Sequence, residues 1–268
     1  MILGGKGVIK FLEQSLRKDL WFCPFQEDFN DGEMALDGFH GAVKILMQSC
    51  YPEPDKRILE LLLMSRLTSS PIKAVVPYMA YSRQANFSQI LNIIATTTIK
   101  ELITVDLHDN CSILPSWIVN LEISPLLLDI SDKYELLIAP DRGAGIKVKK
   151  LAILTGKDQL LLEKIRLKNG SVKIFCPDII NLKGKNCLII DDILATGETI
   201  SQATFQLLKL GAKSVSVFVT HALFNRNNLI KIAQLPLENF YTTDSIHHVK
   251  LPSFIQIITL MKLLKQYL

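Results

Sequence analysis

The sequence contains no hydrophobic run long enough to cross a membrane. Of its 268 residues 49% are hydrophobic and the mean hydropathy is +0.26. No window reaches the roughly eighteen consecutive apolar residues that a membrane span requires. Lys262 and Lys265 interrupt the most apolar stretch, 254–268, and the first six residues lack the arrangement of a signal peptide. We therefore expect a cytoplasmic protein without a membrane partner.

Patterns typical of disulfide frameworks and of zinc sites are missing as well. The cysteines are odd in number and scattered, without any C-x-x-C pair, and they are Cys23, Cys50, Cys111, Cys176 and Cys187. Isolated cysteines of this kind are typical of free thiols in a reducing compartment.

The common nucleotide-binding and nucleic-acid-binding motifs are absent too. Gly156-Lys157 is followed by Asp158, so the chain has no Walker A motif, and Val148 stands where the dinucleotide-binding fingerprint needs its third glycine. Aromatic residues make up 7% of the chain and are not interleaved with basic ones. We expect no nucleic-acid partner, and any ATP must be held in another way.

Positive charge is unevenly distributed along the chain. The whole protein has a net charge of +4, but residues 142–173 hold nine Lys or Arg and two acids, a net of +7. Such a run either forms an ordinary solvated surface or steers polyphosphate ligands into a site, and the residues alone leave both interpretations open.

Short apolar runs alternate with helical patterns, which is typical of an α/β fold with mainly parallel sheets. We expect strands near 43–49, 73–78, 102–107, 136–139, 160–165, 172–175, 187–190, 214–220 and 240–243, and helices near 56–67, 88–97, 146–155, 199–210 and 227–234. The segment Leu121–Pro125 is the expected boundary between two similar domains, 1–123 and 124–268. The last helix is expected to pack back on the first domain.

The most informative segment is Asn186–Ile200. An apolar run ends in Asp191 and Asp192, and a Thr-Gly-x-Thr turn then leads into a helical pattern. Backbone N–H groups at the start of a helix bind phosphate oxygens, and Gly197 lets the backbone approach them closely. The two acids suit sugar hydroxyls or a hydrated Mg²⁺. The segment predicts a sugar-phosphate site, and the alternative is a buried strand that ends in an acidic turn.

Two further strand ends carry polar side chains. The run Ile103–His108 ends in an imidazole, and Leu136–Asp141 ends in a carboxylate that is followed by Arg142–Gly145. Because open α/β sheets bind ligands at the carboxyl ends of their strands, we expect His108 and Asp141 beside ligands. The two glycines after Asp141 could wrap a pyrophosphate.

Taken together, these segments resemble one known family. Asn186–Ile200 resembles the ribose-5-phosphate loop of the phosphoribosyltransferase superfamily. Six further ordered segments resemble motifs of the ribose-phosphate diphosphokinase (phosphoribosyl pyrophosphate synthetase) family, and they are Phe29–Glu33, Val75–Gln84, Ile103–His108, Lys164–Arg166, Thr220–Phe224 and Thr243–Ile246. The resemblance runs from about Phe25 to the C-terminus. It implies two phosphoribosyltransferase-like α/β domains, each with a mainly parallel sheet flanked by helices, and an interdomain active site.

The resemblance also implies an activity and the residues that serve it. The C1 hydroxyl of ribose 5-phosphate would attack the β-phosphorus of ATP, so that diphosphate transfers and AMP leaves. Ribose 5-phosphate would bind at Asp191, Asp192, Ala195, Thr196, Gly197, Glu198 and Thr199. A pyrophosphate loop would comprise Asp141, Arg142, Gly143, Ala144, Gly145 and Lys147. Catalysis would rest on Lys164, Arg166 and His108.

ATP and metal ligands are implied in the same way. ATP would bind at Phe29, Asp31, Glu33, Arg83, Gln84 and His108, and the cofactor Mg²⁺ would be held by His108 and Asp141. In the family the loop that corresponds to Phe29–Glu33 binds the adenine of a neighbouring subunit. The resemblance therefore implies a homo-oligomer, either a dimer or a hexamer.

The sequence departs from the family pattern at several places. The segment between Gln84 and Thr104 is shorter than usual, which bears on regulation by ADP or phosphate. Ala195 and Glu198 replace a common Asp and a common Gly, and Lys147 stands where Arg is common. Two alternatives stay open: a phosphoribosyltransferase that acts on a base, and a catalytically weak regulatory paralogue of the synthetase.

Overall fold

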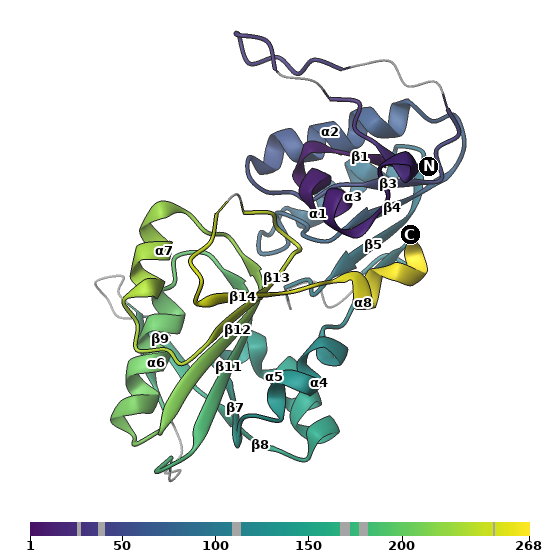
Figure 1. Cartoon of the computed structure of the whole chain (residues 1–268). Coiled ribbons are helices and arrows are strands. Elements are labelled where there is room, and N and C mark those ends of the chain that lie inside the picture. The colour runs from purple at the N-terminus through teal and green to yellow at the C-terminus, as the bar shows by residue number, and fades with distance from the viewer. Residues whose placement is uncertain (26–27, 37–40, 109–113, 167–171, 177–181, 249) are drawn as a thin grey trace. The chain divides into compact units, whose positions relative to one another are not determined.

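The computed structural model describes residues 1–25, 28–36, 41–108, 114–166, 172–176, 182–248 and 250–268 (Figure 1). These residues form two compact units. The first comprises Met1–Glu122, Asp244–His247 and Met261–Leu268, and the second comprises Ile123–Thr243 and His248–Leu260. Each unit has its own six-stranded sheet in which all neighbouring strands are parallel. The predicted α/β class with mainly parallel sheets is confirmed.

The first sheet has the strand order β2-β1-β3-β4-β5-β6. Its strands are β1 (Ile2–Gly4), β2 (Trp21–Phe22), β3 (Ile45–Met47), β4 (Ile72–Val76), β5 (Ile99–Val105) and β6 (Ile118–Leu121). The helical elements of this unit are η1 (Lys6–Val8), α1 (Ile9–Ser15), η2 (Lys18–Leu20), α2 (Pro54–Arg66), α3 (Phe87–Ala95), α8 (Met261–Leu264) and η4 (Lys265–Tyr267).

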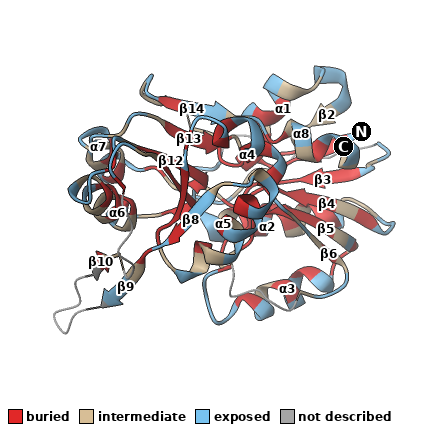
Figure 2. Cartoon of the chain, turned by 90° about the horizontal axis from the view of Figure 1, so that it is seen from below, coloured by how far each residue is buried: buried red, intermediate tan, exposed pale blue. Residues whose placement is uncertain are grey.

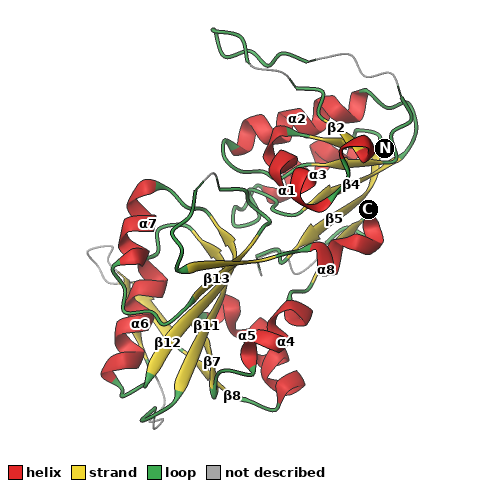
Figure 3. Cartoon of the chain, in the orientation of Figure 1, coloured by secondary structure: helices red, strands yellow, loops and turns green. Residues whose placement is uncertain are grey.

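The second sheet has the order β14-β13-β12-β11-β7-β8. Its strands are β7 (Leu136–Ala139), β8 (Asp158–Leu161), β11 (Asn186–Leu194), β12 (Ser214–Ala222), β13 (Phe240–Thr243) and β14 (Ile255–Ile258). Helices α4 (Ser124–Ser131) and α5 (Arg142–Thr155) cover one face, and α6 (Glu198–Lys209) and α7 (Arg226–Ala233) cover the other (Figure 3). Covering both faces explains why the strands read as continuous apolar runs.

Burial follows this layering. Figure 2 shows strands such as β3 and β4 mostly as buried and strand β9 as largely exposed. The core of the second unit combines apolar side chains of β7, β11 and β12 with Ile200, Ala203 and Leu207 of α6. Among the described residues no helix is both long enough and apolar enough to span a membrane. The four described cysteines are free thiols, as the sequence predicts, and Cys111 lies outside the described residues.

Three local expectations need correction. The single strand expected at 160–165 is two strands, because Leu162 is fully buried at the sheet edge and the charged residues after it pair elsewhere. There β9 (Glu163–Arg166) forms an antiparallel hairpin with β10 (Val172–Phe175). Strand β11 also continues through Asp191 and Asp192 to Leu194, since its pairing with β12 extends that far. Helix α5 starts at Arg142, four residues before the expected start, for a reason given below.

The two sheets share one topology, which fixes where ligands can bind. In each unit the chain first adds a strand on one side and then returns to the other side of its first strand, so the order reverses between β1 and β3 and between β7 and β11. Open α/β sheets bind ligands outside the carboxyl ends of strands at such a reversal. The second unit therefore points to the segments that follow β7 and the end of β11.

At the corresponding reversal of the first unit, the protein fills the space with its own side chains. The side-chain oxygen of Gln48 accepts hydrogen bonds from the backbone N–H groups of Gly7 (2.9 Å) and Ser49 (3.0 Å). Glu60 is fully buried; it accepts from the Gln48 amide and from the Lys6 N–H, and it pairs with Arg57. Burial raises the pKa of Glu60 above its ordinary value, and Arg57 offsets part of that effect.

Gly7 leaves no room for a side chain in this network. A Cβ there would lie 2.1 Å from the carbonyl oxygen of Ser49. We expect Gly7→Ala to destabilise the first unit by about 2 kcal/mol or more, because backbone would have to move. Urea unfolding followed by circular dichroism measures this. Gly145→Ala is the control, since its Cβ would meet only Leu161 at 3.8 Å and it lies within a helix. Equal midpoints for Gly7→Ala and the wild type would contradict the expectation.

Candidate active site

Asp191 and Asp192 are the acidic centre of the second unit. Both are buried near the carboxyl end of strand β11, and each is only 8% exposed. The Asp191 carboxylate accepts from the N–H of Asp192 (2.9 Å), and the Asp192 carboxylate accepts from the N–H of Ile193 (2.8 Å). Burial, then Asp192 and then Asp141 raise the pKa of Asp191 well above its ordinary value, whereas Lys147 acts in the opposite direction. Ligands that donate hydrogen bonds or carry positive charge are favoured here.

Asp141 stands after β7, on the other side of the reversal. It is the N-cap of α5, because its Oδ1 accepts from the N–H groups of Gly143 (3.0 Å) and Ala144 (3.4 Å). This cap starts the helix at Arg142 despite the glycines, so residues 142–147, to which the resemblance assigns pyrophosphate binding, form the first turns of α5. The first N–H groups of α5 are thus partly used by the protein itself.

Lys164 connects the β9–β10 hairpin to Asp141 and to Thr199 at the start of α6. Its Nζ lies 3.6 Å from Asp141 Oδ2 and donates to Thr199 Oγ1 at 3.2 Å. Arg166 belongs to the same strand, β9, and its backbone pairs with Val172. One lysine therefore bridges the segment after β7 and the segment after β11 within a single unit.

The segment between β11 and α6, residues 195–199, leads directly into a helix N-terminus, and we call it the sugar-phosphate loop after the ligand that the sequence predicts for it. Gly197 has a φ of +75°, a left-handed conformation that only glycine adopts without strain. Thr196 Oγ1 accepts from the N–H of Glu198 (3.3 Å), and α6 begins at Glu198. The positive end of a twelve-residue helix thus lies next to Thr196, Gly197 and Thr199.

Helix α7 supports this loop, a role that was not predicted from the sequence. The Asn228 amide is buried and donates to the carbonyl of Ala195 at 2.6 Å and to that of Leu223 at 2.9 Å. Asn225 and Asn228 also form a capping box at the start of α7. The two asparagines three residues apart were the available sequence signal, but they indicated only a helix start.

The described side chains include few metal donors that lie close together. Within the described ranges no three His, Cys, Asp or Glu side chains are grouped so that they alone could hold an ion. Mg²⁺ in phosphoryl-transfer sites commonly takes one or two carboxylates and completes its shell with substrate phosphates and water. Asp141 fits such a site, because Oδ2 is free of the capping bonds and faces only Lys164 among the contacts described.

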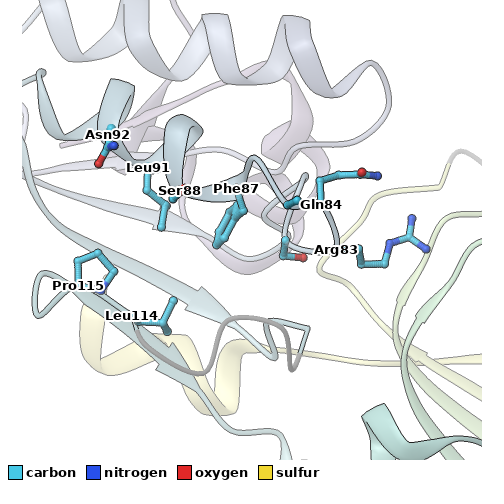
Figure 4. A pocket seen from close by; sticks show the side chains of 10 residues that line it. Arg83, Gln84, Phe87, Ser88, Leu91, Asn92, Leu114 and Pro115 are labelled. Atoms are coloured by element: carbon cyan, nitrogen blue, oxygen red, sulfur yellow. The ribbon is translucent and has the colours of Figure 1, made fainter.

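The first unit carries the residues predicted for ATP. Arg83 and Gln84 follow β4 and line a pocket of about 620 Å³ (Figure 4). Its apolar wall comprises Phe87, Leu91, Leu114 and Pro115, and its polar groups are Ser82, Ser88, Asn92, Arg83 and Gln84. An apolar pocket of this size with a few polar groups suits a small organic ligand.

His108 follows the neighbouring strand β5 and is half-buried. Asp106, two residues earlier, has a φ of +50°, and Tyr81, two residues before Arg83, has a φ of +66°. Such conformations are strained for residues other than glycine and gather at functional sites. Both strained residues stand beside residues that the sequence assigned to nucleotide binding.

The loop that contains Phe29, Asp31 and Glu33 forms a closed turn. The N–H of Phe29 donates to the Glu33 carbonyl (2.9 Å), and Asp31 accepts from the Glu33 N–H (3.0 Å). Asp28 pairs with Lys6 and Lys56 and holds the base of the turn. The Phe29 ring is 60% exposed, which is unusual for a large apolar side chain.

The predicted residues thus fall into groups by unit. The second unit brings together Asp141, Lys147, Lys164, Asp191, Asp192 and the sugar-phosphate loop. The first unit places Arg83, Gln84 and His108 at the carboxyl ends of the adjacent strands β4 and β5 and carries Phe29–Glu33 on a separate loop.

Comparison with known proteins identifies the fold class and then the family. Residues 136–240 match the phosphoribosyl transferase domain, so the second unit has the fold of the phosphoribosyltransferases. Phosphoribosylpyrophosphate synthetase from Mycobacterium smegmatis has the same fold over 100% of this chain and 96% of its own, with a TM-score of 0.80 and 21% identity.

Sequence relatives cover both units. The ribose-phosphate pyrophosphokinase of Sulfurisphaera tokodaii is 33% identical over 221 residues, which cover 75% of this chain and 76% of that protein. The ribose-phosphate pyrophosphokinase of Pyrococcus furiosus is 32% identical over 253 residues, covering 87% and 90%. The chain belongs to the ribose-phosphate pyrophosphokinase family.

Replacing Asp191 should stabilise the protein when no ligand is present. Because folding raises the pKa of this carboxyl, the folded state loses stability as the pH rises above the ordinary range of an aspartate. We expect Asp191→Asn to raise the melting temperature at pH 7.5 by about 2–4 °C in chelator-containing buffer, and by less at pH 5. Asp158→Asn is the control, since Asp158 is exposed and pairs only weakly with Lys185. A melting temperature for Asp191→Asn below that of the wild type at pH 7.5 would contradict this expectation.

Proposed function

We propose that this protein transfers the β,γ-diphosphoryl group of ATP to the C1 hydroxyl of ribose 5-phosphate, giving phosphoribosyl pyrophosphate and AMP. The observation that carries the proposal is the position of Lys164, whose Nζ reaches Asp141 and Thr199 at the reversal of the second sheet. Membership of the ribose-phosphate pyrophosphokinase family supports the same reaction.

In this proposal the second unit binds the sugar. The N–H groups at the start of α6, together with the hydroxyls of Thr196 and Thr199, donate hydrogen bonds to the 5-phosphate. The ribose hydroxyls donate to Asp191 and Asp192, which relieves part of the repulsion between the two carboxylates. Asn228 keeps the sugar-phosphate loop in place through the Ala195 carbonyl.

The chemical step requires neutralisation of charge more than covalent catalysis. The C1 oxygen forms a bond to the β-phosphorus, the bond from that phosphorus to the oxygen of AMP breaks, and the hydroxyl proton passes to water. Lys164 and Arg166 on β9 neutralise charge on the transferring phosphoryl oxygens. A permanently charged arginine together with a mobile lysine suits that role.

Mg²⁺ is the proposed cofactor, with Asp141 and His108 as its protein ligands. When bound, it would neutralise phosphate oxygens of ATP. The Asp141 carboxylate fits this task because one of its oxygens is not engaged in capping α5.

The first unit is proposed to bind ATP. Arg83 and Gln84 contact the nucleotide at the pocket that they line with Phe87 and Leu91. Phe29, Asp31 and Glu33 are proposed to bind the adenine of ATP held by another subunit, which makes a homo-oligomer necessary. The 60% exposure of Phe29 supports a role outside its own unit.

The two alternatives are less well supported. A phosphoribosyltransferase acting on a base needs only the second unit, whereas the relatives align with both. The regulatory paralogue was kept open by Glu198, a carboxylate next to the phosphate position. Its contacts with Lys231 and Gln202 remove that objection.

Purified protein given ATP, ribose 5-phosphate and Mg²⁺ should form AMP and phosphoribosyl pyrophosphate in equal amounts, as measured by chromatography. Excess chelator should stop the reaction. Formation of ADP in place of AMP, or formation of neither nucleotide, would reject the proposed function.

Lys164→Ala should lower kcat by about a hundredfold to a thousandfold, the usual effect of removing one charge that stabilises a transition state. The KM for ribose 5-phosphate should change little. Lys209→Ala is the matched control, because Lys209 is exposed in the last turn of α6, away from the loop. Near-normal turnover of Lys164→Ala would mean that the lysine is a structural contact only.

Phe29→Ala should raise the KM for ATP about tenfold while leaving the KM for ribose 5-phosphate unchanged, because the loss of an aromatic contact affects only the adenine. Sedimentation should show that the wild-type protein is an oligomer under assay conditions. A fully active monomer would refute the assignment of this loop to another subunit.

A further inference from the structure

Glu198 places a negative charge where a phosphate is expected. It is the first residue of α6, directly after Gly197 of the sugar-phosphate loop. A carboxylate at a helix N-terminus stabilises the helix, but it competes with an anionic ligand for the same positive end. An unpaired carboxylate at this position would weaken binding of a sugar phosphate through repulsion.

The structure shows where this charge is directed. Glu198 Oε2 lies 2.8 Å from Lys231 Nζ on α7, and Oε1 accepts from the Gln202 amide at 2.9 Å. Hydrogen bonds from Lys231 and then from Gln202 lower the pKa of Glu198, so the group stays ionised and paired. The carboxylate is therefore held on the side of α7 and of the next turn of α6.

Lys231 is fixed relative to the loop by the packing of its own helix. A Cβ on Gly197 would lie 3.3 Å from Cδ1 of Ile232 and 3.7 Å from Cδ of Lys231. Asn228, one turn earlier on α7, donates to the Ala195 carbonyl. Asn228, Lys231 and Ile232 of α7 thus all lie close to the loop, and the ammonium of Lys231 is part of the loop's immediate surroundings.

We propose that Lys231 is a positioning residue for the sugar phosphate: it holds Glu198 away from the 5-phosphate and cancels its charge. This inference rests on the proposed function, because it concerns the ribose-5-phosphate site. Lys231 and Glu198 act as a pair: ribose 5-phosphate binding requires the lysine because the acid is present.

Stability and binding separate this role from that of an ordinary surface ion pair. The two side chains are 41% and 49% exposed, and exposed pairs contribute little to folding. Loss of Lys231 should therefore leave the melting temperature almost unchanged. Substrate binding should change clearly, because the freed carboxylate lies beside a ligand with about two negative charges.

The test compares four proteins under the AMP-forming assay: wild type, Lys231→Met, Glu198→Gln and the double variant. Methionine retains the apolar stem that packs against Gly197 and removes only the charge. We expect Lys231→Met to raise the KM for ribose 5-phosphate roughly three- to tenfold, as expected for one unpaired charge within several ångströms of a phosphate in a partly open site. The kcat and the KM for ATP should stay unchanged.

The double variant carries the decisive result. With the acid neutralised, Lys231→Met should no longer matter, so Glu198→Gln/Lys231→Met should return to the wild-type KM. Glu198→Gln alone should lower the KM, because it removes the negative charge and leaves the positive charge of Lys231 in place. The ratio between the KM of Lys231→Met and that of the wild type should also fall as KCl is added, since salt screens the repulsion.

Lys185→Met is the matched control. Lys185 pairs with Asp158 at 3.1 Å and is 31% exposed, and it precedes the amino end of β11, opposite the end that leads to the loop. It removes the same charge from the same unit and should leave every kinetic constant unchanged. A similar KM increase in this control would attribute the effect to net charge and overturn the proposal.

Ligand-induced stabilisation provides a readout that does not depend on turnover. Ribose 5-phosphate alone should raise the melting temperature of the wild type more than that of Lys231→Met at equal concentration. Equal stabilisation of both proteins, or a double variant as impaired as Lys231→Met, would overturn the proposal. If the wild type formed no AMP but bound ribose 5-phosphate in this way, the proposed function would fail while the role of Lys231 stood.

Discussion

The second unit is organised around a concentration of negative charge at the reversal of its sheet. Asp141, Asp191 and Asp192 lie close enough that burial and mutual repulsion raise the pKa of Asp191, and Glu198 adds a fourth carboxylate nearby. A site for phosphates can work there only if each acid has a defined partner. The compensating groups are Lys147 and the N-terminus of α5, Lys164 on β9, Lys231 on α7 and the N-terminus of α6. Lys147 and Lys164 belong to the positive run 142–173, so part of that run offsets the charge of these acids.

Much of the arrangement was readable from the sequence because buried parallel strands leave a strong signal. The apolar runs predicted β7, β10 and β13 with their observed bounds, and polar residues at strand ends marked Asp141, His108 and Asp191. Among the strands that were missed, β1, β6 and β14 are three or four residues long and lie at or next to an edge of their sheet. The bounds of α5 were wrong because a side-chain cap at Asp141 outweighed the poor helix propensity of Gly143 and Gly145.

The partners of the loop could not be predicted, because they depend on tertiary packing. Lys231 stands 33 residues after Glu198, and Asn228 stands 33 residues after Ala195, with nothing in the intervening sequence to indicate either contact. An unusual acid in a phosphate loop reads as a defect when the sequence is considered alone. With its partner in view, it is one half of a charge pair that spans two helices.

The two units differ in what occupies the point where the strand order reverses. In the first unit this point is filled by the side chains of Gln48 and Glu60. Gln48 and Glu60 satisfy the backbone donors of Gly7 and Lys6 from within, so these donors need no ligand. The second unit instead buries Asp191 beside Asp192 and near Asp141, which raises the pKa of Asp191. The two sheets thus share one topology but differ at the reversal: internal hydrogen bonds close one, and the other holds three carboxylates. If the second unit binds ribose 5-phosphate as proposed, the abundance of this ligand in a cell would influence how long the unit resists unfolding and proteolysis.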